Sequence, residues 1–152
     1  MSRIDLSVTR RVVIPQEQKI RVLVVDDDPN FVEATRVSLA ADRRIEVVGG
    51  AASGEEAVRQ AAALRPEVVA MDVAMPGLDG MEATRLIRKD QPDCRVVLVS
   101  GSIFVDRGDE GLEAAHAAGA SAYVVKSRVA LDLAEVVVSV ARSAGNMPAS
   151  ST

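Results

Sequence analysis

Short apolar runs alternate along this chain with longer segments whose apolar residues recur at helical spacing. The apolar runs are Ile20–Val25, Ile45–Ala51, Glu67–Met71, Arg95–Val99 and Ser121–Val125. Val22–Val25 and Val96–Val99 are apolar at every position, which is typical of strands that are covered on both faces. We therefore expect a parallel sheet with helices on each side.

The segments between the runs carry helix signals. Ser53 and Glu56 have the spacing of a capping box, and Asp79 and Glu82 repeat it. The expected helices are Pro29–Ala41, Ser53–Leu64, a helix that follows the Asp79 capping signal and ends near Lys89, Leu112–Ala118 and Leu131–Arg142. The alternation predicts an α/β fold, a flavodoxin-like (βα)5 doubly wound parallel sheet with right-handed crossovers and strand order 2-1-3-4-5.

The two ends of the chain fall outside this alternation. Residues 1–18 hold a few alternating apolar positions and a proline, and we expect a poorly ordered N-terminal extension, with a short added strand as the alternative. Residues 143–152 are mostly small and polar, and we expect a flexible tail or linker there. The predicted domain covers residues 19–142, and a chain of 152 residues is the usual size of one domain.

Composition and charge narrow the classes of partner. A formal net charge of −4 gives no general reason to expect DNA or an anionic membrane surface as a partner. The single cysteine, Cys94, excludes an internal disulfide and is expected to be an ordinary, partly buried thiol. No apolar run approaches the roughly 20 residues that span a bilayer, so we expect a cytoplasmic protein.

Polar groups suited to metal and phosphate chemistry follow four of the five apolar runs. They are Asp26 and Asp27 after the first run, Asp72 after the third, Ser100 after the fourth and Lys126 after the fifth. Because the ligand site of such a sheet lies where the strand order reverses, between strands 1 and 3, the carboxylates are expected to converge. An all-oxygen site favours a hard cation, Mg²⁺ or Mn²⁺, while a lysine supplies a point charge for phosphate.

Histidine chemistry is not expected to contribute. His116 is the single histidine and stands on a predicted helix without a His or Cys partner nearby, so we interpret it as a surface residue.

The region Lys19–Arg142 resembles the CheY-like receiver domain of two-component response regulators. The matching segments are Asp26-Asp27, Asp72 with Met75-Pro76-Gly77-Leu78-Asp79-Gly80, Ser100, Gly119-Ala120-Ser121 and Tyr123-Val124-Val125-Lys126. Lys126-Ser127, which lacks the proline common after this lysine, is similar to the branch that often precedes a helix-turn-helix output domain.

The resemblance implies that Asp72 accepts a phosphoryl group. It also implies that Asp26 and Asp27 hold Mg²⁺ with Asp72, and that the backbone carbonyl of Ala74 is a further ligand. The expected donor is a sensor histidine kinase or a phosphotransfer protein. Turnover of an external substrate is not expected, since a phosphohydrolase of this kind places a second Asp where Ala74 stands.

The remaining implied roles concern the response to phosphorylation. Lys126 pairs with the acceptor carboxylate and then with the phosphoryl group, Ser100 donates a hydrogen bond to a phosphoryl oxygen, and Tyr123 turns inward as the switch. The fourth helix, fifth strand and fifth helix then form the expected output surface. The chain is expected to be a single-domain regulator or the receiver part of a DNA-binding transcriptional regulator, so the output is a separate protein or an attached domain. A homodimer is possible, and direct nucleic-acid binding by this chain is not expected.

Two features depart from the family pattern. Ser100 replaces the more usual threonine, which retains the hydroxyl and loses a methyl that couples to Tyr123. The segment Gly101–Gly111 is longer than usual and holds an apolar triplet, interpreted as a surface loop or as a cover or partner site. This loop is the one support for the alternative function, a phosphorylation-independent docking or dimerisation module.

Overall fold

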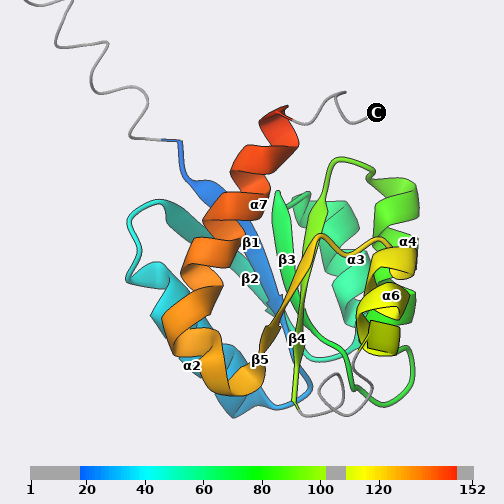
Figure 1. Cartoon of the computed structure of the whole chain (residues 1–152). Helices are drawn as coiled ribbons and strands as arrows, with labels where there is room; N and C mark the ends of the chain where they lie inside the picture. Colours follow the sequence, from blue (N-terminus) through cyan, green and yellow to red (C-terminus); the bar gives the residue numbers. More distant parts are fainter. Residues whose placement is uncertain (1–17, 102–108, 147–152) are drawn as a thin grey trace, which may run out of the picture.

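The computed structural model describes residues 18–101 and 109–146 (Figure 1). The expectations for residues 1–17, and for the part of the long loop from residue 102 to residue 108, lie outside the described residues.

Five parallel strands form one sheet, in the predicted order β2-β1-β3-β4-β5. The strands are β1 (Ile20–Val25), β2 (Ile45–Ala51), β3 (Val68–Asp72), β4 (Arg95–Ser100) and β5 (Ala122–Val125). All five match the predicted runs to within one residue at either end, because each run is both apolar and bounded by polar residues. Strands β1 and β3 are neighbours, so the carboxyl ends that carry Asp26 and Asp72 lie side by side.

The helices are α2 (Pro29–Ala40), α3 (Gly54–Leu64), α4 (Gly80–Asp90), α6 (Asp109–Ala118) and α7 (Ala134–Asn146). Two short helical segments connect β5 to α7: the 3₁₀ helix η1 (Lys126–Arg128) and the π-helix η2 (Val129–Leu133). Within the described residues, no helix is long and apolar enough to cross a membrane.

Three helix boundaries differ from the sequence prediction by more than one residue. Helix α6 begins at Asp109 instead of Leu112. The last helix was predicted as Leu131–Arg142, but Leu131 lies in η2 and α7 continues to Asn146, so residues 143–146 of the predicted tail are helical. Small residues such as Ser143 do not stop a helix, and the first proline beyond Arg142 is Pro148.

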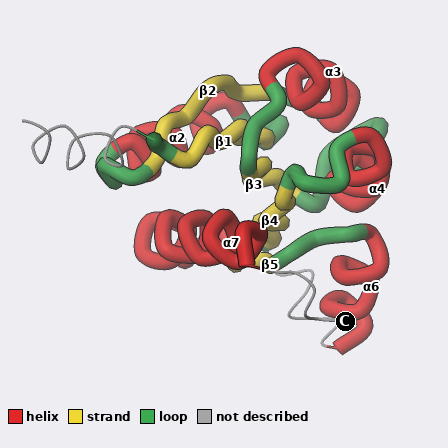
Figure 2. The backbone as a smooth tube through the Cα atoms, turned by 90° about the horizontal axis from the view of Figure 1, so that it is seen from above, coloured by secondary structure: helices red, strands yellow, loops and turns green. Residues whose placement is uncertain are grey.

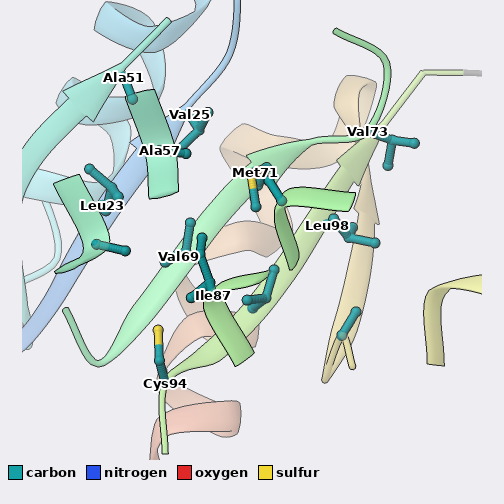
Figure 3. Packing of buried hydrophobic residues seen from close by; sticks show 14 of the residues in the cluster. Leu23, Val25, Ala51, Ala57, Val69, Met71, Val73, Ile87, Cys94 and Leu98 are labelled. Atoms are coloured by element: carbon teal, nitrogen blue, oxygen red, sulfur yellow. The ribbon is translucent and has the colours of Figure 1, made fainter. Parts of the chain in front are cut away.

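Helices cover both faces of the sheet (Figures 1 and 2), as the continuously apolar strands predicted. Helices α2 and α7 lie on one face, where Leu39, Leu133 and Val137 pack against Val22 and Val97. Helices α3, α4 and α6 lie on the other face and enclose a second apolar cluster (Figure 3). Two cores on one sheet fix the strand ends rigidly, which is what a site at those ends requires.

The prediction that Cys94 is partly buried is wrong. We expected a partly buried thiol, but Cys94 is 1% exposed and belongs to the cluster in Figure 3 together with Val69 and Ile87. The Cys94 N–H donates to the carbonyl of Gln91, the C-cap of α4, at 3.0 Å, so the turn between α4 and β4 holds this residue against the core. Burial raises the pKa of the Cys94 thiol to about 11, while nearby arginines such as Arg88 act in the opposite direction.

Both predicted capping pairs are present. The Ser53 hydroxyl accepts a hydrogen bond from the Glu56 N–H at 3.1 Å, and Asp79 accepts one from the Glu82 N–H at 2.9 Å. The Glu56 carboxylate accepts from the N–H of Ala52, one residue before the cap, at 2.9 Å. These caps fix the starts of α3 and α4, the two helices that flank the segment after Asp72.

Candidate functional site

Three aspartates meet at the carboxyl edge of the sheet, as predicted. Asp26, Asp27 and Asp72 each offer a carboxylate oxygen, and these oxygens lie within 4.8 Å of one another. Asp26 and Asp72 are buried, with 1% and 4% of their surfaces exposed, whereas Asp27 is exposed. The cluster is therefore a buried pair of carboxylates with one carboxylate at the rim.

Lys126 supplies the positive charge of the site. Its Nζ lies 2.9 Å from Oδ2 of Asp26 and 3.6 Å from Oδ2 of Asp72. Desolvation by itself would lower the pKa of Lys126, but the contacts with Asp26 and Asp72 outweigh desolvation and raise this pKa, so the side chain is an ammonium. The sequence analysis expected Lys126 to pair with Asp72, and the structure places it between both carboxylates, nearer to Asp26.

The three carboxylates carry more negative charge at neutral pH than the Lys126 ammonium offsets. Burial raises the pKa of Asp72 to about 6, and the charge of Asp26 adds to this effect. Lys126 and a hydrogen bond from the Ala74 N–H, at 3.3 Å, lower this pKa and only partly compensate. A second cation beside Asp72 would relieve this imbalance.

The residues present fit a hard divalent ion. Oδ1 of Asp26 accepts a hydrogen bond from the Asp28 N–H at 2.8 Å. Oδ2 of Asp26 is buried and receives no aligned hydrogen bond, even though the Lys126 ammonium is at ion-pair distance. A buried carboxylate oxygen in that state, next to two further carboxylates, matches the all-oxygen donor set that Mg²⁺ or Mn²⁺ prefers.

A family model described as "Response regulator receiver domain" matches residues 22–138. The chain belongs to the response regulator receiver family. It is a receiver domain of the kind found in two-component systems, and the fold and the acidic cluster agree with that assignment.

Two relatives that are similar to the receiver differ in the functions that their names state. A protein-glutamate methylesterase/protein-glutamine glutaminase of Alkalilimnicola ehrlichii is 44% identical over 108 residues, which cover 71% of this chain and 27% of that protein. The response regulator protein VraR of Staphylococcus aureus is 37% identical over 118 residues, which cover 78% of this chain and 54% of that protein. The matched part thus spans about a quarter and about half of the lengths of these relatives.

Solved structures of receiver domains are similar to this chain. The response regulator domain of Thermotoga maritima CheB superposes with a TM-score of 0.71 and 35% identity, covering 86% of this chain and 98% of that one. The signal receiver domain of the putative response regulator NarL from Mycobacterium tuberculosis superposes with a TM-score of 0.75 and 29% identity, covering 82% and 98%.

The strand register brings Ser100 to the same edge of the receiver as Asp72. Val99 pairs with Asp72, and Ser100 follows at the end of β4, where it is 1% exposed. Its hydroxyl donates to the carbonyl of Gly101 at 3.3 Å. Ser100 also pairs with Val125, the residue before Lys126, so the hydroxyl and the ammonium occupy adjacent strand ends.

Tyr123 lies two residues into β5 and is half-buried. It packs against the cluster formed by α3, α4 and α6, and it also lines a shallow pocket of about 400 Å³ with Arg128, Leu131 and Glu135. Its role as a switch, like that of the Ala74 carbonyl as a ligand, stays a prediction. His116 is exposed on α6, as expected for a surface residue.

Two glycines hold the segment after Asp72 in place, and the sequence analysis had not assigned them a role. A Cβ on Gly80 would lie 2.1 Å from the carbonyl oxygen of Asp72, and a Cβ on Gly54 would lie 2.1 Å from that of Leu78. The Gly80 N–H donates to the Val73 carbonyl at 2.9 Å, which closes the loop. The Met75–Gly80 motif could have indicated a structural role for Gly80. No local sequence feature indicated one for Gly54.

Proposed function

We propose that this receiver is a phosphorylation-dependent switch that accepts a phosphoryl group on Asp72 in a Mg²⁺-dependent reaction. One observation carries the proposal: the Asp72 carboxylate lies at the meeting point of the Lys126 ammonium and two further carboxylates. This arrangement supplies a nucleophile, a lysine cation and a site for a metal cation within one cluster.

The proposed reaction is an in-line transfer from a phosphohistidine of a sensor histidine kinase or a phosphotransfer protein. A carboxylate oxygen of Asp72 forms a bond to phosphorus while the phosphorus–nitrogen bond of the donor breaks and the imidazole leaves. Asp26 and Asp27 would hold Mg²⁺ with Asp72, and the bound ion offsets charge on the carboxylate and on the phosphoryl oxygens. Lys126 offsets the remaining charge and orients the acyl phosphate.

The product places new negative charge and new acceptor oxygens beside Ser100. A Ser100 hydroxyl that turns from Gly101 to a phosphoryl oxygen empties space at the end of β4, and Tyr123 is the proposed side chain that responds. The proposed output surface consists of α6, β5 and α7. It is supported by the pocket on β5, η2 and α7, where Leu131 is 70% exposed.

The relatives suggest what the output serves. The similarity to VraR and to the methylesterase covers the receiver portion, so a transcriptional or an enzymatic output is a property that we propose only for an attached domain or a separate partner. The chain itself is proposed to turn over no external substrate, because Ala74 stands two residues after Asp72. The cytoplasm, where such phosphodonors act, is the proposed location.

Intact mass spectrometry tests the proposal. The protein is incubated with acetyl phosphate and Mg²⁺, with Asp72→Asn as the test variant and the exposed Asp90→Asn as the matched control. The parent and the control should gain one phosphoryl mass, and Asp72→Asn should gain none. Omission of Mg²⁺ should abolish the gain.

A parent that gains no mass from acetyl phosphate is tested next with a phosphorylated histidine kinase or phosphotransfer domain. Failure with every donor, despite measured Mg²⁺ binding, would contradict the proposal and leave the docking module as the function.

A further inference from the structure

We propose that Phe31 is a positioning residue for Lys126: its ring face holds the ammonium at the carboxylate pair. The inference rests on the proposed function, because Lys126 matters through the phosphoryl transfer at Asp72. It concerns a residue that neither the motif nor the acidic cluster contains.

The contact itself is direct. The Nζ atom of Lys126 lies over the Phe31 ring, 4.6 Å from its centroid. The same Nζ lies 2.9 Å from Asp26 and 3.6 Å from Asp72. The ammonium is thus enclosed between two carboxylates and one aromatic face, which is within the roughly 6 Å at which a cation–π attraction acts.

Lys126 needs such a contact because its flexible side chain does not by itself fix the position of the ammonium. The side chain has four flexible methylenes, is 33% exposed and starts at the first residue of η1, beyond the end of the sheet. Its contact with Asp26 Oδ2 lacks the alignment of a hydrogen bond. Charge attraction alone therefore leaves the ammonium free to move along the rim of the site.

Phe31 is well placed to restrict this motion. It lies in the first turn of α2, where Asp28 caps the helix and the carbonyl of Asp28 accepts the Phe31 N–H at 3.0 Å. The half-buried side chain packs against the apolar cluster under α2 and α7. Its ring therefore has a fixed position three residues after the N-cap Asp28, which directly follows Asp26 and Asp27 in the chain.

The ring also restricts Lys126 without a directional hydrogen bond. A cation–π contact attracts the whole ammonium charge to the face of the ring, so N–H groups that point away from the ring remain available for oxygen atoms. The ammonium can then pass from Asp26 toward Asp72 or a phosphoryl oxygen while it remains over the same ring. A leucine at this position would fill the space but would not attract the cation.

The test separates electronic from packing effects. Phosphorylation rates with acetyl phosphate and Mg²⁺ are compared for the parent, Phe31→Leu, Phe31→Tyr and proteins with mono-, di- and trifluorinated phenylalanine at position 31. Fluorination keeps the ring and weakens its negative face. We expect Phe31→Leu to be roughly 3- to 10-fold slower, Phe31→Tyr to retain the parent rate within about 2-fold, and the rate to fall with each fluorine.

A matched packing control is Val32→Ala, because Val32 is the next residue of α2 and packs against the same cluster. It should lower the thermal midpoint without slowing phosphorylation. A second readout needs no phosphoryl group: the NMR shifts of the Lys126 ε-methylene protons should lie upfield in the parent and return toward the random-coil position in Phe31→Leu.

The outcomes distinguish this inference from the proposed function. Rates that do not respond to fluorination, or a Phe31→Tyr protein as slow as Phe31→Leu, would overturn the positioning role. Unshifted ε-methylene protons in the parent would overturn the contact. If the parent accepts no phosphoryl group but shows the ring-current shift, the proposed function fails while the placement of Lys126 by Phe31 stands.

Discussion

Replacing Asp72 by asparagine should stabilise the fold at neutral pH. Asparagine keeps the shape of the side chain and removes a buried charge that faces Asp26 across the cluster. The pKa of Asp72 is raised from 3.8 to about 6, so the folded state binds its proton more tightly than the unfolded state does. Stability from this group is therefore present at low pH and is lost as the pH rises through 6.

The size of the effect follows from the shift. Roughly two pKa units correspond to about 3 kcal/mol at most. Because Asp27 and Ala74 are exposed at the rim, solvent screens part of this cost, and a gain of about 1–3 kcal/mol is expected. The gain should be small near pH 4, reach about half its final value near pH 5 and be complete above about pH 7.

Urea unfolding of both proteins at pH 5, 6, 7 and 8, with a chelator present, measures this difference. The thermal midpoint of Asp72→Asn at pH 8 should be higher by roughly 3–5 °C for each kcal/mol. Added Mg²⁺ should stabilise the parent more than the variant and narrow the gap. A gain that does not change between pH 5 and 8, or a variant less stable than the parent at pH 8, would refute the reasoning.

Two substitutions and one labelling experiment test other parts of the structure. Gly80→Ala should cost about 2 kcal/mol or more in urea unfolding, because the added Cβ meets the Asp72 carbonyl; an unchanged midpoint would contradict the close approach. Lys126→Met should lower stability by about 1–2 kcal/mol without Mg²⁺, since Asp26 loses its counter-charge, whereas the exposed Lys89→Met should not. Cys94 should react with a thiol reagent at pH 8 only after unfolding, and fast labelling of the native protein would argue against its burial.

The sheet and the acidic cluster were predictable from the sequence for one physical reason. A strand covered on both faces is apolar throughout, so its end is marked by the first polar residue, and in a parallel sheet those ends share an edge. Asp26, Asp72 and Ser100 were each marked in this way, and each lies where the pattern indicated.

What the sequence did not predict depends on tertiary contacts. The π-helix η2 and the early start of α6 have no periodic signal, because such segments are set by how neighbouring helices pack. The preference of Lys126 for Asp26 depends on distances that spacing does not encode. In the sequence, Phe31 looks like any aromatic residue on a helix, because its contact with Lys126 joins residues that are far apart along the chain.

The central claim, that Asp72 is the acceptor, is tested most directly by trapping the acyl phosphate. The protein is phosphorylated with Mg²⁺ present and reduced with borohydride, which converts a phosphorylated aspartate to homoserine, and the modified position is then mapped by peptide mass spectrometry. Homoserine at position 72 alone, and none without Mg²⁺, is the predicted result. Modification at Asp26 or Asp27 with Asp72 intact would contradict the assignment.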